Sequence, residues 1–211
     1  MASTRPIYRL FKRLMDFSCA LLLGLILLPV LLVLWILIRI RMGSPVVFTQ
    51  ERAGRDAKPF TVFKFRSMIE AYDEKGDPLP DAERITLFGR FLRRSSLDEL
   101  PQLWNVIRGD MSLVGPRPLF MEYVPHYSAE ERRRLDVRPG VTGLAQINGR
   151  NTLGWEDRLR LDVEYVDRAS IAFDLWILWR TLFKVLGSEG VPSTGLDPNK
   201  KFSDYRKDGQ A

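Results

Sequence analysis

The sequence predicts an α+β protein that is mainly helical, with a membrane-associated N-terminal segment, interfacial amphipathic helices and a small β-hairpin around one compact domain. Three observations lead to this prediction. Residues 17–38 contain no charged side chain. Residues 46–48 and 61–66 have the composition or the alternation of short strands, and apolar residues recur at helical spacing over 155–166. The chain after residue 42 has about 170 residues, enough for a hydrophobic core of its own.

The uncharged segment is long enough to enter a membrane, because roughly 20 apolar residues cross a bilayer core. Pro29 lies near its middle, and proline removes a backbone donor and kinks a helix. Basic residues, which favour the cytoplasmic side, flank both ends: Lys12, Arg13, Arg39 and Arg41. Residues 1–42 are therefore interpreted as a helix–break–helix hairpin that enters one leaflet and returns. A single tilted, Pro-kinked spanning helix is the alternative that these residues leave open.

Charge and rare residue types limit the chemistry that the chain can perform. The balance of 32 basic against 26 acidic residues gives a formal charge of +6, which favours anionic partners. A single cysteine, Cys19, excludes an intrachain disulfide, and a single histidine, His126, excludes zinc sites built from several His and Cys. The arginines are dispersed among acids without a nucleic-acid motif, so no nucleic acid is expected as a partner. The groups that remain available for catalysis or binding are carboxylates, arginines, lysines and a hard metal ion.

Residues 43–187 are predicted to form the compact domain on the cytoplasmic side. Short helices are expected at residues 85–92, 100–107 and 129–135, with irregular segments at 71–81, 109–118 and 138–150. The apolar helix 171–186 is either interfacial, as its tryptophans suggest, or a buried core helix. Residues 188–211 are polar and are expected to form a loosely held tail.

Two adjacent carboxylates stand out in the stretch from Ser95 to Pro101. Ser96 followed by Glu99 fits a capping box, which would place Asp98 and Glu99 at a helix N-terminus, where the dipole favours carboxylates and bound phosphates. Taken alone, this pattern is explained as well by an ordinary cap and a favourable first-turn charge.

Two further stretches present arginine in a stiff or glycine-rich backbone. Arg117 lies between two prolines, so little entropy remains to be lost when it binds a phosphate. Residues 138–150 contain three glycines between two arginines, and glycine lets backbone N–H groups approach an anion. The stretch is not a Walker A motif, and the chain contains no G-x-G-x-x-G. As a pattern it is a weak indication of phosphate binding.

Taken together and in this order, several stretches resemble the bacterial sugar transferases, and more narrowly the small monotopic polyprenyl-phosphate phosphoglycosyl transferases. The matching stretches are residues 50–68, 95–119, 138–150 and 161–166. The resemblance implies transfer of a sugar 1-phosphate from a UDP-sugar to undecaprenyl phosphate, with release of UMP, as the first membrane step of a glycoconjugate pathway. It also implies a monotopic catalytic domain on the cytoplasmic face of the bacterial inner membrane, and it favours the re-entrant hairpin.

The resemblance implies roles for particular residues. The nucleophile of a ping-pong reaction through a phosphosugar–aspartyl intermediate would be Asp98, with Glu99 as its partner. The family depends on Mg²⁺, for which Asp98 is the implied ligand. The positions implied to bind substrate phosphates or nucleotide are Lys64, Arg93, Arg117, Arg138, Gln146, Asn148 and Arg150. The chain departs from the family at Leu28, since a serine commonly precedes the proline that breaks the membrane helix.

The residues alone leave several points open. No residue identifies the sugar, and the oligomeric state, including a homodimer, is not determined. A non-catalytic membrane-anchored adaptor of a glycan assembly complex, which grips anionic lipid through its basic face, is the competing functional class. It predicts salt-sensitive membrane association without binding of a UDP-sugar.

Overall fold

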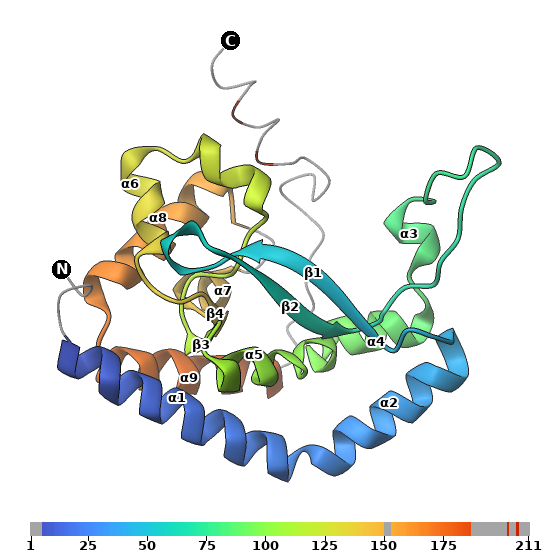
Figure 1. Cartoon of the computed structure of the whole chain (residues 1–211), viewed down its shortest axis with the longest axis horizontal. Helices are drawn as coiled ribbons and strands as arrows, with labels where there is room; N and C mark the ends of the chain where they lie inside the picture. The colour runs from blue at the N-terminus through green and yellow to red at the C-terminus, as the bar shows by residue number, and fades with distance from the viewer. Residues whose placement is uncertain (1–5, 150–152, 187–201, 203–205, 207–211) are drawn as a thin grey trace.

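The computed structural model describes residues 6–149, 153–186, 202 and 206 (Figure 1). Two long helices form a bent base, and the other elements lie on one side of it (Figure 1). The helices are α1 (Pro6–Ile26), α2 (Leu28–Met42), α3 (Asp81–Arg84), α4 (Leu87–Arg94), α5 (Gln102–Arg108), α6 (Ala129–Arg132), α7 (Leu144–Asn148), α8 (Trp155–Arg168) and α9 (Ile171–Leu186). The strands are β1 (Val47–Ala53), β2 (Pro59–Phe65), β3 (Ser112–Val114) and β4 (Gly140–Thr142).

The bend of the base lies between α1 and α2. The two helix axes differ in direction by 62°, and the break is at Leu27, two residues before the proline that predicted it. Pro29 lies in the first turn of α2, where its missing N–H is tolerated. Leu27 still accepts a backbone hydrogen bond from Leu31 at 2.9 Å and donates one to Leu23 at 2.8 Å. Within the described residues no single helix could cross a bilayer, whereas this bent pair passes by length and composition.

The predicted β-hairpin is confirmed, although its first strand is longer than expected. Strands β1 and β2 pair antiparallel from Val47 opposite Phe65 to Ala53 opposite Pro59. Gly54 closes the turn by donating its N–H to the Lys58 carbonyl at 2.8 Å. The hairpin matters for the candidate site because β2 carries Lys64.

Two segments predicted to be irregular contain a second, parallel pair of strands, which corrects that prediction. Val114 of β3 lies opposite Thr142 of β4. A side chain on Gly115, Gly140 or Gly143 would approach neighbouring backbone to less than 3.0 Å. These glycines therefore allow two chain segments to approach each other. The short pair could not be predicted because it depends on contacts between distant segments.

A buried polar network fixes α1 to the domain, and no local sequence pattern predicts it. Asp174 of α9 is fully buried and accepts hydrogen bonds from Lys12 at 2.8 Å, Tyr8 at 3.1 Å and Tyr165 at 2.7 Å. Asp16, also buried, accepts from the side chain and backbone of β3 at 2.7 and 3.2 Å. Because each buried carboxylate has partners from other elements, the network holds α1 in one position.

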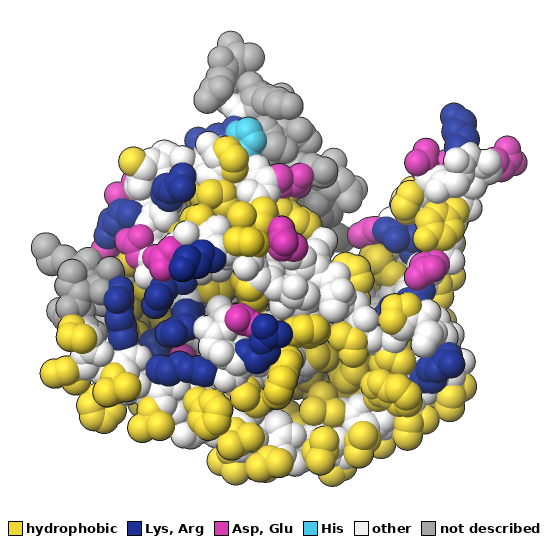
Figure 2. Space-filling model, in the orientation of Figure 1, with side chains coloured by type: hydrophobic (Ala, Val, Ile, Leu, Met, Phe, Trp, Pro, Cys, Tyr) yellow, Lys and Arg dark blue, Asp and Glu magenta, His cyan; other side chains and the backbone are white. Residues whose placement is uncertain are grey.

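Helix α9 combines both of the interpretations offered for it. Its inner face buries Ile177 and Asp174 completely, so it belongs to the core. Its outer face exposes large apolar side chains: Leu175, Trp176, Trp179, Leu182 and Phe183. Exposed apolar side chains also line α1 and α2, and Figure 2 shows them gathered along the lower face of the molecule. We call this face the apolar underside. Its extent marks it as an interaction surface.

The C-terminal segment is described at two positions only. Phe202 is fully buried in an aromatic cluster with Tyr123, Tyr127 and Trp155, and Arg206 forms an ion pair with Glu131. The expectation of a loosely held tail is therefore wrong at these two residues. A lone phenylalanine in a polar stretch carries too little signal to predict such docking.

Candidate active site

The adjacent carboxylates Asp98 and Glu99 lie on a 3-10 turn between α4 and α5. The expected capping box is wrong, because Ser96 makes no side-chain cap and adopts a left-handed backbone with φ of +57°. Helix α5 begins only at Gln102, so Pro101 lies at its N-cap, where no intrahelical N–H donor is needed. The Glu99 side chain is thereby free to reach cations on other elements.

Glu99 is held by two cations. Lys64 of β2 donates to its Oε1 at 2.8 Å, and Arg117 contacts Oε1 at 2.6 Å and Oε2 at 3.4 Å in a forked arrangement. Burial by itself would raise the pKa of Glu99, but the charges and hydrogen bonds of Arg117 and Lys64 outweigh it and hold the pKa well below its usual value. Glu99 is therefore a permanently charged carboxylate that orients two cations.

Asp98 has a different environment. Its exposed fraction is only 7%, and its carboxylate accepts no hydrogen bond from the described part of the chain. Burial, followed by the charge of Glu99, raises the pKa of Asp98 to about 6, although Lys64, Arg93 and Arg117 oppose the shift. A desolvated carboxylate without hydrogen-bonding partners, next to three cations, is suited to attack an electrophile that carries negative charge.

Arg93 lies in the last turn of α4, shortly before the dyad in the sequence. Its Nε donates to Ser67 at 2.8 Å, which fixes the guanidinium beside the turn that carries Asp98. Lys64, Arg93 and Arg117 are therefore the predicted phosphate-binding residues that the structure brings to the dyad of Asp98 and Glu99.

Two further arginines near Arg117 were missed by the sequence analysis. Arg52 of β1 stacks over Phe120, with 3.5 Å from its guanidinium carbon to the ring centre, and Arg158 of α8 stacks over Trp155 at 4.7 Å. For both arginines burial lowers the pKa, and the charge of Arg117 lowers it further. Arg52 lies within the stretch 50–68 that resembles the family, so the resemblance could have indicated it. No local sequence pattern marks Arg158.

The other predicted site residues lie elsewhere. Arg138 donates to the Gly109 carbonyl at 2.8 Å, beyond the C-terminal end of α5, whereas the dyad precedes its N-terminal end. Gln146 donates to Val141 and Asn148 to Leu144, each at 2.8 Å. In the described chain no hydrogen bond or ion pair joins these three side chains to the dyad. Arg150 lies outside the described residues.

The donor set is compatible with Mg²⁺ only if substrate completes it. The described residues contain no group of three or more His, Cys, Asp or Glu that could hold a metal ion. Mg²⁺ is commonly bound through one or two carboxylates together with substrate phosphates. Glu99 is engaged by Lys64 and Arg117, so Asp98 is the carboxylate that fits this arrangement.

The unusual pKa of Asp98 leads to a measurable prediction. In metal-free protein its carboxyl should titrate near pH 6, above an ordinary aspartate, so the charged form is gained as the pH rises through that value. Carboxyl carbon NMR, assigned by comparison with Asp98→Asn, would measure the midpoint. Lys64→Met should raise the midpoint further because it removes an opposing charge, whereas Lys58→Met should leave it unchanged. A midpoint near 4 would contradict the role of burial.

Comparison with known proteins identifies the family of this chain. Residues 7–188 match the family described as bacterial sugar transferase, so the chain is a member of that family. Among its relatives, the uncharacterized sugar transferase EpsL of Bacillus subtilis is 48% identical over 194 residues, covering 92% of this chain and 96% of EpsL.

Two longer relatives have more specific names. The undecaprenyl-phosphate galactose phosphotransferase of Salmonella typhimurium is 38% identical over 86% of this chain, and the match covers 42% of that protein. The UDP-glucose:undecaprenyl-phosphate glucose-1-phosphate transferase of Escherichia coli is 41% identical over 83% of this chain and 40% of its own length. The chain thus spans nearly all of EpsL but about two fifths of these two transferases.

Proposed function

We propose that this protein is a phosphoglycosyl transferase that moves a sugar 1-phosphate from a UDP-sugar to undecaprenyl phosphate in two steps, with release of UMP. Family membership and the names of the longer relatives support the overall reaction. The observation that carries the two-step route is the contrast within the dyad. Glu99 is held by Lys64 and Arg117, whereas Asp98 is buried without a hydrogen-bonding partner among the described residues.

In the first step a carboxylate oxygen of Asp98 attacks the phosphorus that bears the sugar. A bond forms between this oxygen and phosphorus while the bond between phosphorus and the bridging oxygen of the diphosphate breaks, so UMP leaves with the electron pair. Lys64, Arg93 and Arg117 lie where they can neutralise the charge that develops on the phosphate oxygens. Mg²⁺, when bound with the diphosphate, would add further charge neutralisation.

In the second step a phosphate oxygen of undecaprenyl phosphate attacks the same phosphorus. The bond to Asp98 breaks, the carboxylate is restored, and undecaprenyl diphosphate sugar is formed. The same three cations serve both steps, because both displace an anionic leaving group at one phosphorus. Glu99 keeps Lys64 and Arg117 in place throughout, since its low pKa prevents it from taking up a proton.

The first test measures UMP release in the absence of lipid acceptor, with UDP-galactose and UDP-glucose as donors. The two-step route predicts at most one UMP per chain and a protein adduct with the mass of a sugar phosphate. No UMP until acceptor is added would contradict the covalent route. Failure to bind any UDP-sugar, combined with salt-sensitive liposome association, would favour the non-catalytic adaptor instead.

The same proposal places the protein in one leaflet of the bacterial inner membrane, with the dyad on the cytoplasmic face. The bent pair α1 and α2, together with the outer face of α9, presents the apolar underside (Figure 2). The 62° bend turns α2 back toward the domain, where Leu34 and Ile38 are buried against Leu92 of α4. This geometry suits a monotopic protein whose soluble donor and lipid acceptor meet at an interface.

Topology can be tested with single cysteines in a Cys19→Ser background. Cysteines introduced before Lys12 and after Met42 should both react with a membrane-impermeant reagent from the cytoplasmic side. The re-entrant position predicts equal labelling on that side, because both ends of the pair remain there. Labelling of the two sites from opposite sides would establish a spanning helix.

A further inference from the structure

A second group of cations lies at the other end of α5 from the dyad. Arg138, for which the resemblance implies binding of substrate phosphate or nucleotide, contacts Gly109 there. A small pocket beside it is formed by α1, by the turn of the β-hairpin and by the segment 136–138. Its cationic side chains are Arg9, Lys12, Arg55 and Arg138. We call this the basic pocket.

Of the charged side chains that line the basic pocket, four are cationic and two are acidic. Its two carboxylates are Asp16 and Asp136, and Asp16 is occupied by hydrogen bonds from β3. Lys12 is directed to Asp174 at 2.8 Å. Arg55 donates a hydrogen bond to the exposed Asp56 at 3.1 Å, an ion pair that water screens strongly.

The electrostatics of Arg138 show that these cations repel one another. Burial lowers the pKa of Arg138, and the charges of Arg55, Arg13 and Arg9 lower it further, although Asp16 opposes them. Arg13 is itself directed to the last carbonyls of α5, those of Val106 at 2.6 Å and Ile107 at 2.7 Å. Like charges that converge from three separate segments favour a bound anion.

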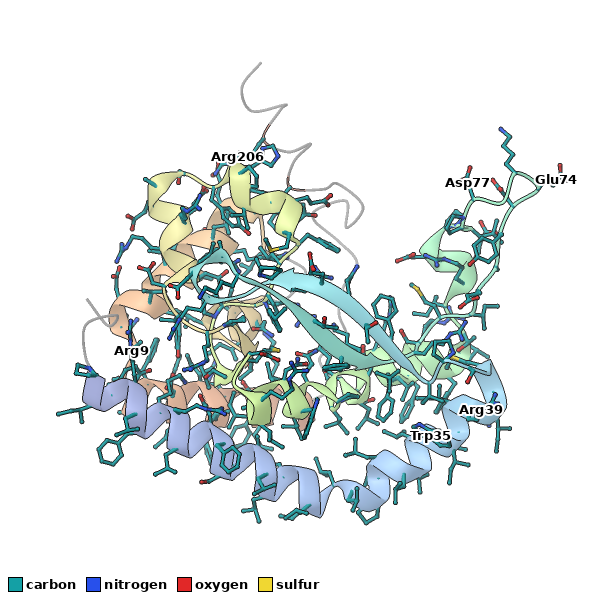
Figure 3. All side chains as sticks on the ribbon, viewed as in Figure 1. Arg9, Trp35, Arg39, Glu74, Asp77 and Arg206 are labelled. Atoms are coloured by element: carbon teal, nitrogen blue, oxygen red, sulfur yellow. The ribbon has the colours of Figure 1, made fainter. Side chains whose placement is uncertain are left out.

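The position of the pocket indicates what kind of anion it receives. On α1, Arg9 and Lys12 alternate with the strongly exposed Leu10, Phe11 and Leu14. Arg9 extends from α1 toward the domain (Figure 3), and basic side chains gather immediately above the apolar underside (Figure 2). The pocket therefore opens where lipid head groups would lie, if the underside contacts the bilayer as proposed.

We propose that the basic pocket binds the phosphate of an anionic phospholipid of the phosphatidylglycerol class. The acyl chains of this lipid lie along the apolar side of α1. Guanidinium groups pair with phosphate oxygens in a bidentate manner, and the apolar rim supplies the preference for a lipid over a soluble phosphate. The site is separate from the dyad, since the two lie at opposite ends of α5. It rests on the proposed membrane position but not on sugar transfer.

The test uses full-length protein in neutral detergent and native mass spectrometry to count bound molecules. The probes are dihexanoylphosphatidylglycerol, dihexanoylphosphatidylcholine and sn-glycerol 1-phosphate. The variant Arg9→Gln with Arg55→Gln should weaken binding of the phosphatidylglycerol probe by about tenfold or more, since each charge-assisted pair is lost. The control, Arg132→Gln with Arg160→Gln, removes the same charge from other exposed surface and should bind it like the wild type.

Three results would overturn the proposal. Phosphatidylcholine bound as tightly as phosphatidylglycerol would show that the phosphate charge is not recognised. Glycerol phosphate bound with equal affinity, and with the same loss in Arg9→Gln with Arg55→Gln, would identify a soluble phosphate as the ligand. If both double variants lost the same affinity for the phosphatidylglycerol probe, the loss would reflect the total charge of the protein and not this pocket. Turnover of Arg9→Gln with Arg55→Gln in detergent is expected to stay near wild type, so failure of the sugar-transfer proposal would leave this test intact.

Discussion

Replacing Asp98 by asparagine is expected to reduce turnover by roughly 10⁴-fold or more, the size of loss that follows removal of a covalent nucleophile. Asparagine keeps the shape of the side chain but cannot form the acyl phosphate. Buried next to Glu99, the neutral amide also relieves repulsion, so the fold should be preserved. Steady-state rates with UDP-sugar and polyprenyl phosphate, together with intact-protein mass after donor addition, provide the measurement.

Two variants give this experiment its controls. Asp77→Asn changes an exposed aspartate in the loop before α3, and it should retain full activity (Figure 3). Glu99→Gln should lose about 10²–10³ in rate, because Lys64 and Arg117 lose the carboxylate that orients them, yet it should still form the adduct. Wild-type turnover by Asp98→Asn, or an adduct on that variant, would show that another group is the nucleophile.

Replacing Asp162 by alanine is expected to lower the free energy of unfolding by about 3–5 kcal/mol. Asp162 and Arg134 form an ion pair in which both side chains are almost completely buried, with 2.8 Å between Arg134 Nη2 and the carboxylate. Removing one partner leaves the arginine charge in the core without compensation. Arg134 also donates to the backbone carbonyl of Arg117 at 2.6 Å, so the loss should also loosen the dyad. Chemical denaturation in detergent, followed by circular dichroism, measures the effect.

The matched control, Asp157, lies five residues before Asp162 on the same helix. Asp157 pairs with Arg160 at 3.2 Å on the surface of α8, where both side chains are more than half exposed. Asp157→Ala should therefore change the free energy of unfolding by less than about 1 kcal/mol. Similar losses for Asp157→Ala and Asp162→Ala would contradict the view that burial decides the importance of the pair. Asp162→Asn, which retains a hydrogen-bond acceptor, should fall between them.

The sequence predicted the elements that depend on local pattern. The break near Pro29, the β-hairpin and the helices around residues 87–94 and 155–168 are confirmed, since periodicity and proline chemistry act over a few residues. The capping box at Ser96 is wrong because this residue adopts a left-handed backbone, in which its side chain caps no N–H. The same local motif does form a capping box at Ser128 and Glu131, where the backbone of Ser128 is extended.

The candidate site was predictable only in part. Lys64, Arg93 and Arg117 meet the dyad as expected, although they come from three separate segments. Arg138 was placed with them because it lies in a stretch that matches the family, but its side chain contacts the far end of α5. A sequence match to the family indicates that a stretch has a similar backbone. The direction in which a side chain points depends in addition on tertiary packing. The buried partners of Asp174 depend on that packing as well.

Helix α5 directly connects helix α1 to the dyad of Asp98 and Glu99. Arg13 of α1 grips the last carbonyls of α5, and the turn carrying Asp98 leads into its first residue. A seven-residue helix is a stiff strut of about 10 Å. If α1 lies in a leaflet and Asp98 is the nucleophile, as proposed, a change in the tilt or depth of α1 would displace the reacting carboxylate. Reaction rates would then depend on bilayer thickness and lateral pressure, so kinetics in detergent and in membranes of different composition should not coincide.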